Sequence, residues 1–146
     1  MTTATVPLQV NQAESAARAV FDAINSGDLS CLESAVTSDF VDHGSPIPIP
    51  PGPEGYRQIL TFVTQVLKLR YELKDFFTTP DRIVIRAIGT GVGVDSVHGP
   101  GAAGKPFSMQ TVHIYRTEGD KLAEHWGIRD EFGARVELGT IPAPQF

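Results

Sequence analysis

An alternating segment between residues 107 and 115 puts several groups that can handle protons on one face of a predicted strand. That face carries Phe107, Met109, Thr111, His113 and Tyr115. An imidazole has an unperturbed pKa of about 6.5, so it can accept and return a proton near neutral pH. Large apolar side chains beside an imidazole, a phenol and a hydroxyl are typical of a pocket wall. The alternative interpretation is an ordinary core, in which the histidine is buried with satisfied hydrogen bonds.

A second histidine joins this face in one of the two registers that the following hairpin allows. A three-residue loop at 118–120 places His113 opposite His125 on the same face, because opposed residues of an antiparallel pair share a face. A four-residue loop exchanges the faces, and His113 is then joined by Trp126, Ile128 and Asp130. We prefer the first register, in which the two histidines share one wall of the pocket.

Other polar residues fall in segments that are predicted to be loops. Asp42 and His43 lie in the proline-rich segment 39–55, which is expected to be an ordered loop. They belong either to the rim of the pocket or to a surface turn, where Asp is common. His98 lies in the glycine-rich segment 95–106, which we expect to be a mobile flap with an exposed histidine.

Composition excludes several classes of partner and chemistry. The chain has 146 residues, 12 of them basic and 17 acidic, and no run of Lys or Arg, which argues against a nucleic-acid partner. No apolar stretch approaches the ~20 residues of a membrane span, and the N-terminus lacks the features of a signal peptide, so we expect a cytoplasmic protein. The single cysteine, Cys31, excludes a disulfide framework. Phosphate loops, nucleophile elbows and metal-ligand helices are absent, so neither a metal nor an organic cofactor is expected.

The hydrophobic period divides the chain into three helices followed by strands. Helices are predicted at 11–24, 28–36 and 54–67, and strands at 69–74, 82–94, 106–118 and 121–130, with a short last strand at 135–138. Residues 1–10 are expected to form a flexible arm and residues 11–146 a single domain. Segregated helices and strands predict an α+β fold, in which a curved antiparallel sheet and three N-terminal helices enclose a conical pocket.

Four strings of the sequence resemble a known family. They are FVDHGSPIPIPPGPEGYRQIL, DRIVIRAIGTGVGV, GKPFSMQTVHIYRTEGDKLAEHWGIRDEFG and ELG, and the segment HIYRTEGDKLAEHWGIRD is the most specific part. These strings resemble the SnoaL-like polyketide cyclases of the nuclear-transport-factor-2-like (NTF2-like) superfamily, from about residue 11 to residue 138. The resemblance implies a cone-shaped α+β barrel with a deep apolar pocket, cofactor-free chemistry and a homodimer that packs through the sheet.

The resemblance also implies a reaction. Family cyclases close polyketide rings by an intramolecular aldol reaction, in which a pocket base removes an acidic C–H proton and polar groups stabilise the enolate. Their catalytic Asp lies in the final strand, whereas here Gly127 follows Trp126 and the only Asp of that strand is Asp130. This departure moves the role of the base to a histidine, and His113 matches the family's polar pocket residue on the penultimate strand.

We therefore expect a cofactor-independent cyclase or isomerase that moves protons on a polyketide-like or aromatic small molecule in secondary metabolism. His113 is the expected general acid and base, and His125 or Asp130 orients it or exchanges the second proton. The expected substrate-binding residues are Tyr56, Asp42, His43, Phe107, Met109, Tyr115, Trp126 and Arg129. The two tyrosines are candidate hydrogen-bond donors to an oxyanion.

Two other functions fit the same residues. One is a non-catalytic NTF2-like module that binds a small molecule, and the other is an epoxide-opening, dehydratase or hydroxylase-like relative of the cyclases. An enzyme should bring at least two titratable groups together in one pocket, whereas a carrier should bring one or none.

Overall fold

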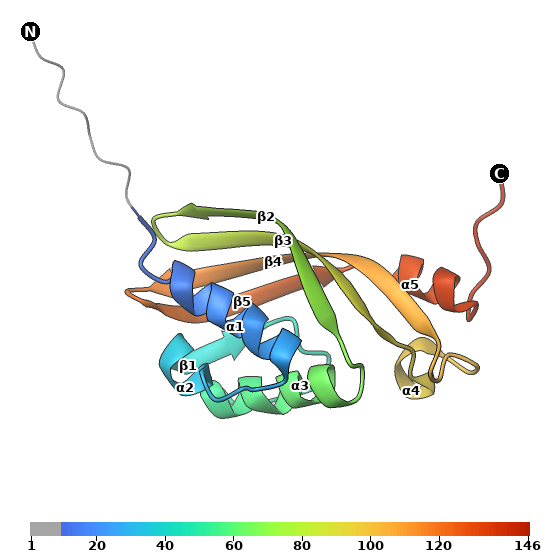
Figure 1. Ribbon diagram of the computed structural model, residues 1–146, viewed down its shortest axis with the longest axis horizontal. Helices are drawn as coiled ribbons and strands as arrows, with labels where there is room; N and C mark the ends of the chain where they lie inside the picture. Colours follow the sequence, from blue (N-terminus) through green and yellow to red (C-terminus); the bar gives the residue numbers. More distant parts are fainter. Residues whose placement is uncertain (1–9) are drawn as a thin grey trace, which may run out of the picture.

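The framework of the protein is a five-stranded sheet in the order β1-β5-β4-β3-β2 (Figure 1). The strands are β1 (Val36–Asp42), β2 (Arg70–Thr79), β3 (Arg82–Val92), β4 (Pro106–Glu118) and β5 (Lys121–Arg129). The structure is a computed structural model that describes residues 10–146, so the expected arm lies outside it except for its last residue. All neighbouring strands pair antiparallel except β1, which runs parallel to β5.

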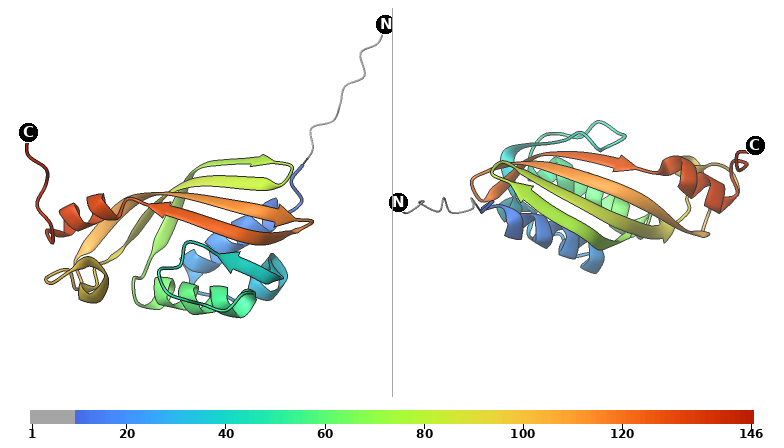
Figure 2. Two further views of the ribbon diagram at one scale, coloured as in Figure 1. Left: turned by 180° about the vertical axis from the view of Figure 1, so that it is seen from behind. Right: turned by 90° about the horizontal axis from the view of Figure 1, so that it is seen from above.

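Three helices cover one face of this sheet, namely α1 (Glu14–Ser26), α2 (Leu32–Ala35) and α3 (Pro53–Gln65). Two further helices, α4 (Asp95–His98) and α5 (Glu131–Leu138), lie at one end of the sheet, away from α1 and α2 (Figure 1). In the part of the chain that the structure describes, the opposite face carries no helix (Figure 2). The expected α+β fold with a curved sheet is confirmed, and the sheet includes a parallel edge strand, β1, that is not among the predicted strands.

The start of α1 ties the chain to the sheet. Asn11 is buried, and its side-chain nitrogen donates to the Thr79 carbonyl at 3.0 Å and to the Thr117 hydroxyl at 3.1 Å. Apolar residues such as Phe21 then recur at helical spacing and face the sheet, and Gly27, with a φ of +82°, ends the helix. Burial of this apolar stripe holds α1 across the concave side of the sheet.

The hairpin of β4 and β5 has a shorter turn than either predicted register. Its loop consists of Gly119 and Asp120, and a β-bulge follows, so that His113 pairs with Gly127. The prediction of a three-residue loop, with His113 directly opposite His125, is therefore wrong. The bulge adds one residue and restores the parity of that register, so the two histidines still face the same side. The four-residue alternative, which exchanges the faces, is excluded.

Two segments adopt a different element from the one predicted. The second helix is only Leu32–Ala35, because Val36 already begins β1 in a segment predicted as helix end and loop. The expected strand at 135–138 belongs instead to α5, since the Asp130 carboxylate accepts a hydrogen bond from the Gly133 backbone at 2.8 Å and caps this helix. Local sequence did not reveal that the residues after Ala35 pair with the distant strand β5, or that Asp130 starts a helix.

The glycine-rich segment 95–106 is better anchored than its composition indicates. It begins with α4, and Ala102 is fully buried in the core. The Asp95 carboxylate accepts a hydrogen bond from the Ala103 backbone at 2.8 Å. His98, which is expected to be exposed, is only 2% exposed. The expectation of a segment with little to pack is therefore wrong, and His98 belongs to the interior.

Candidate functional site

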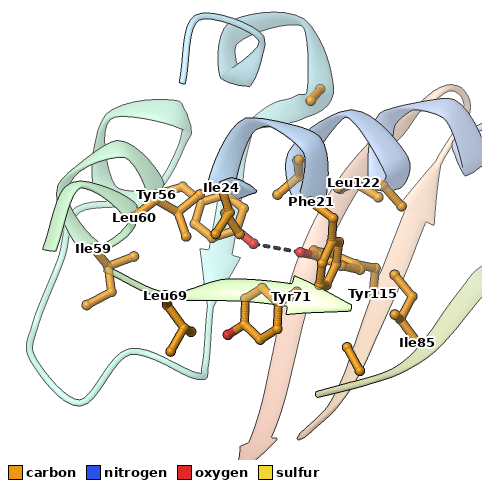
Figure 3. Close-up of a cluster of buried hydrophobic side chains, with 14 of the residues drawn as sticks. Phe21, Ile24, Tyr56, Ile59, Leu60, Leu69, Tyr71, Ile85, Tyr115 and Leu122 are labelled. Atoms are coloured by element: carbon orange, nitrogen blue, oxygen red, sulfur yellow. Dashed lines mark hydrogen bonds between the residues drawn. The ribbon is translucent and has the colours of Figure 1, made fainter. Parts of the chain in front are cut away.

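A cavity of about 620 Å³ lies between the inner face of the sheet and the helices. Its wall is mainly apolar and aromatic, and includes Phe21, Ile24, Ile59, Leu60, Leu69, Tyr71, Phe107 and Met109. Figure 3 shows part of this wall, where side chains from α1, α3 and β2 meet above the sheet. A cavity of this size accommodates a drug-sized molecule, so polar groups in its wall are candidates for chemistry.

Four polar side chains, three of them in this wall, form a continuous chain of hydrogen bonds. Asp42 Oδ1 lies 2.7 Å from His125 Nδ1, and His125 Nε2 lies 3.0 Å from His113 Nδ1. His113 Nε2 lies 3.1 Å from the hydroxyl of Thr111, which donates to the Ala87 carbonyl at 2.8 Å. We refer to Asp42, His125, His113 and Thr111 as the relay. Both imidazoles line the cavity, and the two residues are only 4% and 5% exposed.

Strand pairing and two glycines position the His125 ring. Asp42 is the last residue of β1, and the parallel pairing of β1 with β5 sets it opposite His125. A Cβ atom at Gly44 would lie 3.3 Å from Cε1 of the ring, and one at Gly127 would lie 3.1 Å from it. A side chain at either position would press on the imidazole. Because both residues are glycines, the ring can lie between Asp42 and His113.

The hydrogen positions in the relay follow from counting donors. A hydroxyl has one hydrogen, so while Thr111 donates to Ala87, the proton between Thr111 and His113 is on Nε2. The Nδ1 atom of His113 then accepts from His125, whose other nitrogen holds the proton shared with Asp42. If Thr111 turns its hydrogen toward His113, both contacts of His113 reverse. The relay then holds one proton fewer, although no heavy atom has moved.

Burial sets the acidity of the two ends of the relay in different ways. Burial lowers the pKa of His113 well below its ordinary value, and the charges of His125 and Arg129 act in the same direction. Burial by itself would raise the pKa of Asp42, but the hydrogen bond and charge of His125, a backbone N–H and Arg129 together lower it. At neutral pH, Asp42 is therefore a carboxylate and His113 a neutral imidazole that can accept a proton.

Two phenols lie beside the relay. The hydroxyl oxygens of Tyr56 and Tyr115 are 2.6 Å apart (Figure 3), and the Tyr115 ring lies 4.7 Å from the His125 ring. Burial raises the pKa of both phenols above the ordinary value, and it raises the pKa of Tyr71 to about 12. These phenols stay neutral near pH 7. The pair shares one of its two hydrogens, which leaves the other for an oxygen atom in the cavity.

Arg129 brings a positive charge to the same wall, since it pairs with Thr111 across β4 and β5. Its Nη2 atom donates to the Gly44 carbonyl at 2.8 Å, and its Nε atom lies 3.3 Å from the Glu131 carboxylate. These two contacts hold the guanidinium beside the relay. A fixed cation at this position stabilises negative charge that develops on a neighbouring oxygen.

Most residues that the sequence analysis assigns to the site line the cavity. They are Asp42, Tyr56, Phe107, Met109, His113, Tyr115, His125 and Arg129. Asp42 is not at a rim, because its side chain is only 4% exposed. The structure therefore brings together the residues of the penultimate and final strands with a carboxylate from the first strand.

The other three expected site residues do not line the cavity. Asp130 is the cap of α5, where its carboxylate is exposed and bonded to backbone N–H. His43 and Trp126 stack on each other on the outer face of the sheet, with ring centroids 5.0 Å apart, and His43 Nε2 lies 2.7 Å from Glu124. We assign none of these three residues to the proposed chemistry.

Further contributors to the site have no role in the sequence analysis. Thr111 is on the predicted face, and its spacing of two residues from His113 is the signal that could have assigned it. Tyr71 and Phe21 each meet the His113 ring edge-on, with centroids 5.1 Å away. The alternation of β2 predicts an inward Tyr71, but no local pattern indicates that a side chain of α1 contacts His113.

Within residues 10–146, no group of three or more His, Cys, Asp or Glu side chains is arranged to hold a metal ion. Among the helices described, none has the length and apolar character needed to cross a membrane.

Comparison with protein families matches residues 14–138 to the SnoaL-like polyketide cyclase family. No curated protein matches the chain significantly. Among solved structures, IdmH, a proposed polyketide cyclase from Streptomyces antibioticus, is 25% identical with a TM-score of 0.73, over 88% of this chain and 99% of that chain.

Two further solved structures from Streptomyces species are similar. TsrD from Streptomyces laurentii is 25% identical with a TM-score of 0.75, over 89% of this chain and 96% of that chain. AclR, a proposed hydroxylase from Streptomyces galilaeus, is 20% identical with a TM-score of 0.72, over 90% of this chain and 87% of that chain. At that identity, the likeness to AclR shows the fold alone.

Proposed function

This chain belongs to the SnoaL-like polyketide cyclase family, and from that premise we propose that it is a cofactor-independent cyclase or isomerase of secondary metabolism. It acts by general acid–base proton transfer on a polyketide-like or aromatic small molecule. The observation that carries the proposal is the relay, because a neutral imidazole in an apolar cavity is hydrogen-bonded through a second imidazole to a buried carboxylate. A deep and mainly apolar cavity is typical of sites that bind small apolar molecules of this class.

In the proposed reaction, His113 Nε2 takes a proton from a carbon next to a substrate carbonyl. The C–H bond breaks, its electron pair forms the enolate, and an N–H bond forms. The Nδ1 proton of His113 then moves to His125, whose positive charge faces the Asp42 carboxylate. This step starts from the arrangement in which the Thr111 hydrogen points toward His113, so that Nδ1 carries the ring proton and Nε2 does not. Thr111 then turns its hydrogen to the Ala87 carbonyl, which frees Nε2 for the substrate proton.

The enolate then attacks a second carbonyl carbon of the same molecule in a cyclase, or is reprotonated at another atom in an isomerase. In the cyclase a C–C bond forms, the C=O π bond opens to an alkoxide, and the proton returns from the relay to that alkoxide. The free hydrogen of the Tyr56–Tyr115 pair and the Arg129 guanidinium are available to stabilise the enolate oxygen. All atoms of this sequence come from the substrate and the relay.

The rival function is a binding module without catalysis. An enzyme should bring at least two titratable groups together in one pocket, whereas a carrier should bring one or none. The convergence of Asp42, His125 and His113 in one cavity therefore favours an enzyme. The same groups could also open an epoxide or remove water, but no particular contact favours these reactions over proton transfer at carbon.

Proton exchange at carbon tests the proposal without knowledge of the natural substrate. The probe is 2-tetralone, an aromatic ketone with acidic C–H bonds beside its carbonyl, incubated with the protein in D₂O and followed by proton NMR. We expect faster loss of the C1 proton signal than in buffer, and no change after dialysis against a chelator. Binding of 2-tetralone without accelerated exchange would support the binding module, and activity restored by one metal would contradict the cofactor-free mechanism.

A homodimer is the second part of the proposal. Three large apolar side chains on the uncovered face of the sheet are well exposed: Val41 at 40%, Phe77 at 57% and Ile128 at 67%. Burial of this face against a second copy would remove apolar surface from water. Sedimentation velocity should give a dimer for the native chain and a monomer for Ile128→Glu, and a native monomer would reject this assembly.

A further inference from the structure

The cavity has a second polar region, at the end formed by α4 and α5. These helices lie at the same end of the sheet (Figure 1), and Ser96, His98 and Arg135 from them line the cavity. The Arg135 guanidinium links the two helices, because its Nη2 atom donates to the Val97 carbonyl at 2.8 Å. None of these residues belongs to the relay, so this end has no part in the reaction proposed above.

His98 presents a hydrogen-bond donor to this end of the cavity. The Val94 backbone N–H donates to His98 Nδ1 at 3.0 Å, so Nδ1 carries no hydrogen and the ring proton is on Nε2. The residue is 2% exposed and packs against Phe107, with ring centroids 5.0 Å apart. Within residues 10–146, no protein group accepts from Nε2, and the only fully enclosed side-chain polar atom without a partner is Thr37 Oγ1. The Nε2–H therefore opens onto the cavity, with its acceptor still to be supplied.

Arg135 adds a second positive charge to the cavity, one helical turn after Glu131 on α5. Arg129, the other cavity arginine, lies 3.3 Å from the Glu131 carboxylate. Arg135, in contrast, has no carboxylate within ion-pair distance among residues 10–146, although the whole chain carries a net charge of −5. A guanidinium and a buried N–H donor at the same end of a cavity are groups that can together bind a carboxylate.

The distance between the two polar regions sets the length of the ligand. Phe107 packs against His98, and Phe107 and His113 both face the cavity on β4, six residues apart in sequence. At about 3.3 Å per residue of strand, these two positions are about 20 Å apart. The wall between them includes the apolar side chains of Met109 on β4 and Leu69, the residue before β2.

We propose that the α4–α5 end of the cavity binds a carboxylate at the far end of an elongated, mainly apolar substrate. His98 Nε2–H and the Arg135 guanidinium hold the carboxylate, and the reacting carbon at the other end of the molecule reaches the relay. This inference rests on the proposed function in one respect only, since it takes the cavity to be the substrate site.

A matched pair of fluorescent probes tests the carboxylate site by binding alone. The probes are anthracene-2-carboxylate and its methyl ester, which share the apolar rings and differ in charge. The variants are Arg135→Gln and His98→Asn, in which the Asn oxygen can still accept from the Val94 N–H but the Nε2–H donor is lost. The control is Arg86→Gln, which removes an arginine that pairs with Asp75 on the outer face at 2.6 Å.

We expect the carboxylate to bind the native protein about tenfold tighter than the ester, and each site variant to lose about that factor for the carboxylate only. The control should bind both probes as the native protein does. Equal affinity for the two probes, no loss in Arg135→Gln, or no binding of either probe would overturn the inference. His98→Asn and Arg135→Gln are independent, so a folding failure of the first leaves the second decisive.

Exchange of 2-tetralone separates this inference from the proposed function. That ketone has no carboxylate, so its exchange reports on the relay and not on the carboxylate site. If the protein binds the carboxylate selectively but does not accelerate exchange, the carboxylate site is supported and the proposed enzyme activity is rejected. If the protein accelerates exchange of 2-tetralone but binds both probes equally, the enzyme activity is supported and the carboxylate site is rejected.

Discussion

Two contacts between a histidine and a carboxylate have the same length and lie on opposite faces of the sheet, where β1 runs beside β5. Asp42–His125 on the inner face and Glu124–His43 on the outer face both measure 2.7 Å. The inner side chains are 4% and 7% exposed, whereas the outer ones are 25% and 41% exposed. Glu124 is further engaged by Arg116 at 2.5 Å, in an ordinary surface network.

The environment of the two contacts gives them different properties. Water and salt screen the outer pair, and such pairs contribute little to stability. The inner pair lies where water is excluded, so its electrostatic interactions are stronger. Only the inner pair continues to another imidazole and to a cavity. A short distance between a histidine and a carboxylate is therefore weak evidence of a functional site, whereas burial together with connection to a cavity is strong evidence.

The largest contrast should come from the histidines themselves. His113→Gln removes the group that takes the proton but keeps much of the bulk, so the exchange of 2-tetralone should fall by roughly 10²–10⁴-fold. His43→Gln changes only the outer pair, so the rate of 2-tetralone exchange should stay within about twofold of the native rate. Circular dichroism confirms folding of both variants. If a folded His113→Gln exchanges normally, the base lies elsewhere, and His125 is the next candidate.

The two carboxylates provide a matched amide pair. Asp42→Asn keeps a hydrogen-bond acceptor for His125 but loses the charge that stabilises a protonated relay. Exchange should fall by about 10- to 100-fold, the range known for carboxylates that orient metal-bound histidines. Glu124→Gln makes the same chemical change on the outer face, and both its exchange rate and its unfolding midpoint should match the native protein. Equal effects of the two substitutions would remove the distinction between the faces.

Stability below neutral pH gives a readout independent of any substrate. The unfolded chain protonates His113 near pH 6.5, but the folded protein does not, because burial lowers the pKa of this imidazole. The unfolded state therefore binds more protons as pH falls, and the free energy of unfolding decreases below about pH 6.5, by at most ~1.4 kcal/mol per pH unit for this one group. Asp42, whose pKa is lowered, adds a loss only when pH falls below its unfolded value of 3.8.

Urea unfolding at several pH values measures this effect. His113→Gln should show a shallower decrease than the native protein between pH 6.5 and the pH at which the folded imidazole protonates. Identical slopes for the two proteins would mean that His113 is protonated in the folded state as readily as in the unfolded chain.

The smallest effect is expected at Thr111, which touches the relay only through its hydroxyl. Thr111→Val removes one hydrogen bond to His113 and one to Ala87, and exchange should fall by about two- to tenfold. Because the hydroxyl selects which ring nitrogen of His113 carries the proton, ¹⁵N NMR of the variant should show both neutral tautomers. Thr111→Ser keeps the hydroxyl and should restore one tautomer. A single tautomer in Thr111→Val would assign that selection to another group.

Local patterns were sufficient to predict the inner wall. Alternation along β4 predicts that Met109, Thr111, His113 and Tyr115 share a face, and a short turn brings β5 back beside them. Even the wrong loop length preserved the shared face of the two histidines, because the bulge added the residue that the shorter turn removed. The resemblance to the family likewise runs from about residue 11 to residue 138, so the fold class was accessible from the sequence.

Long-range pairing was needed for the remainder of the site. Asp42 lies in a segment rich in proline and was expected at a rim, but β1 pairs with β5 and carries the carboxylate to His125, 83 residues away in sequence. His98 lies among glycines, where composition favours exposure, yet the Val94 backbone and Phe107 hold it inside the cavity wall. The physical reason is common to both: local spacing determines which face of a strand a residue occupies, whereas burial and hydrogen-bond partners depend on which distant segments pack against that face.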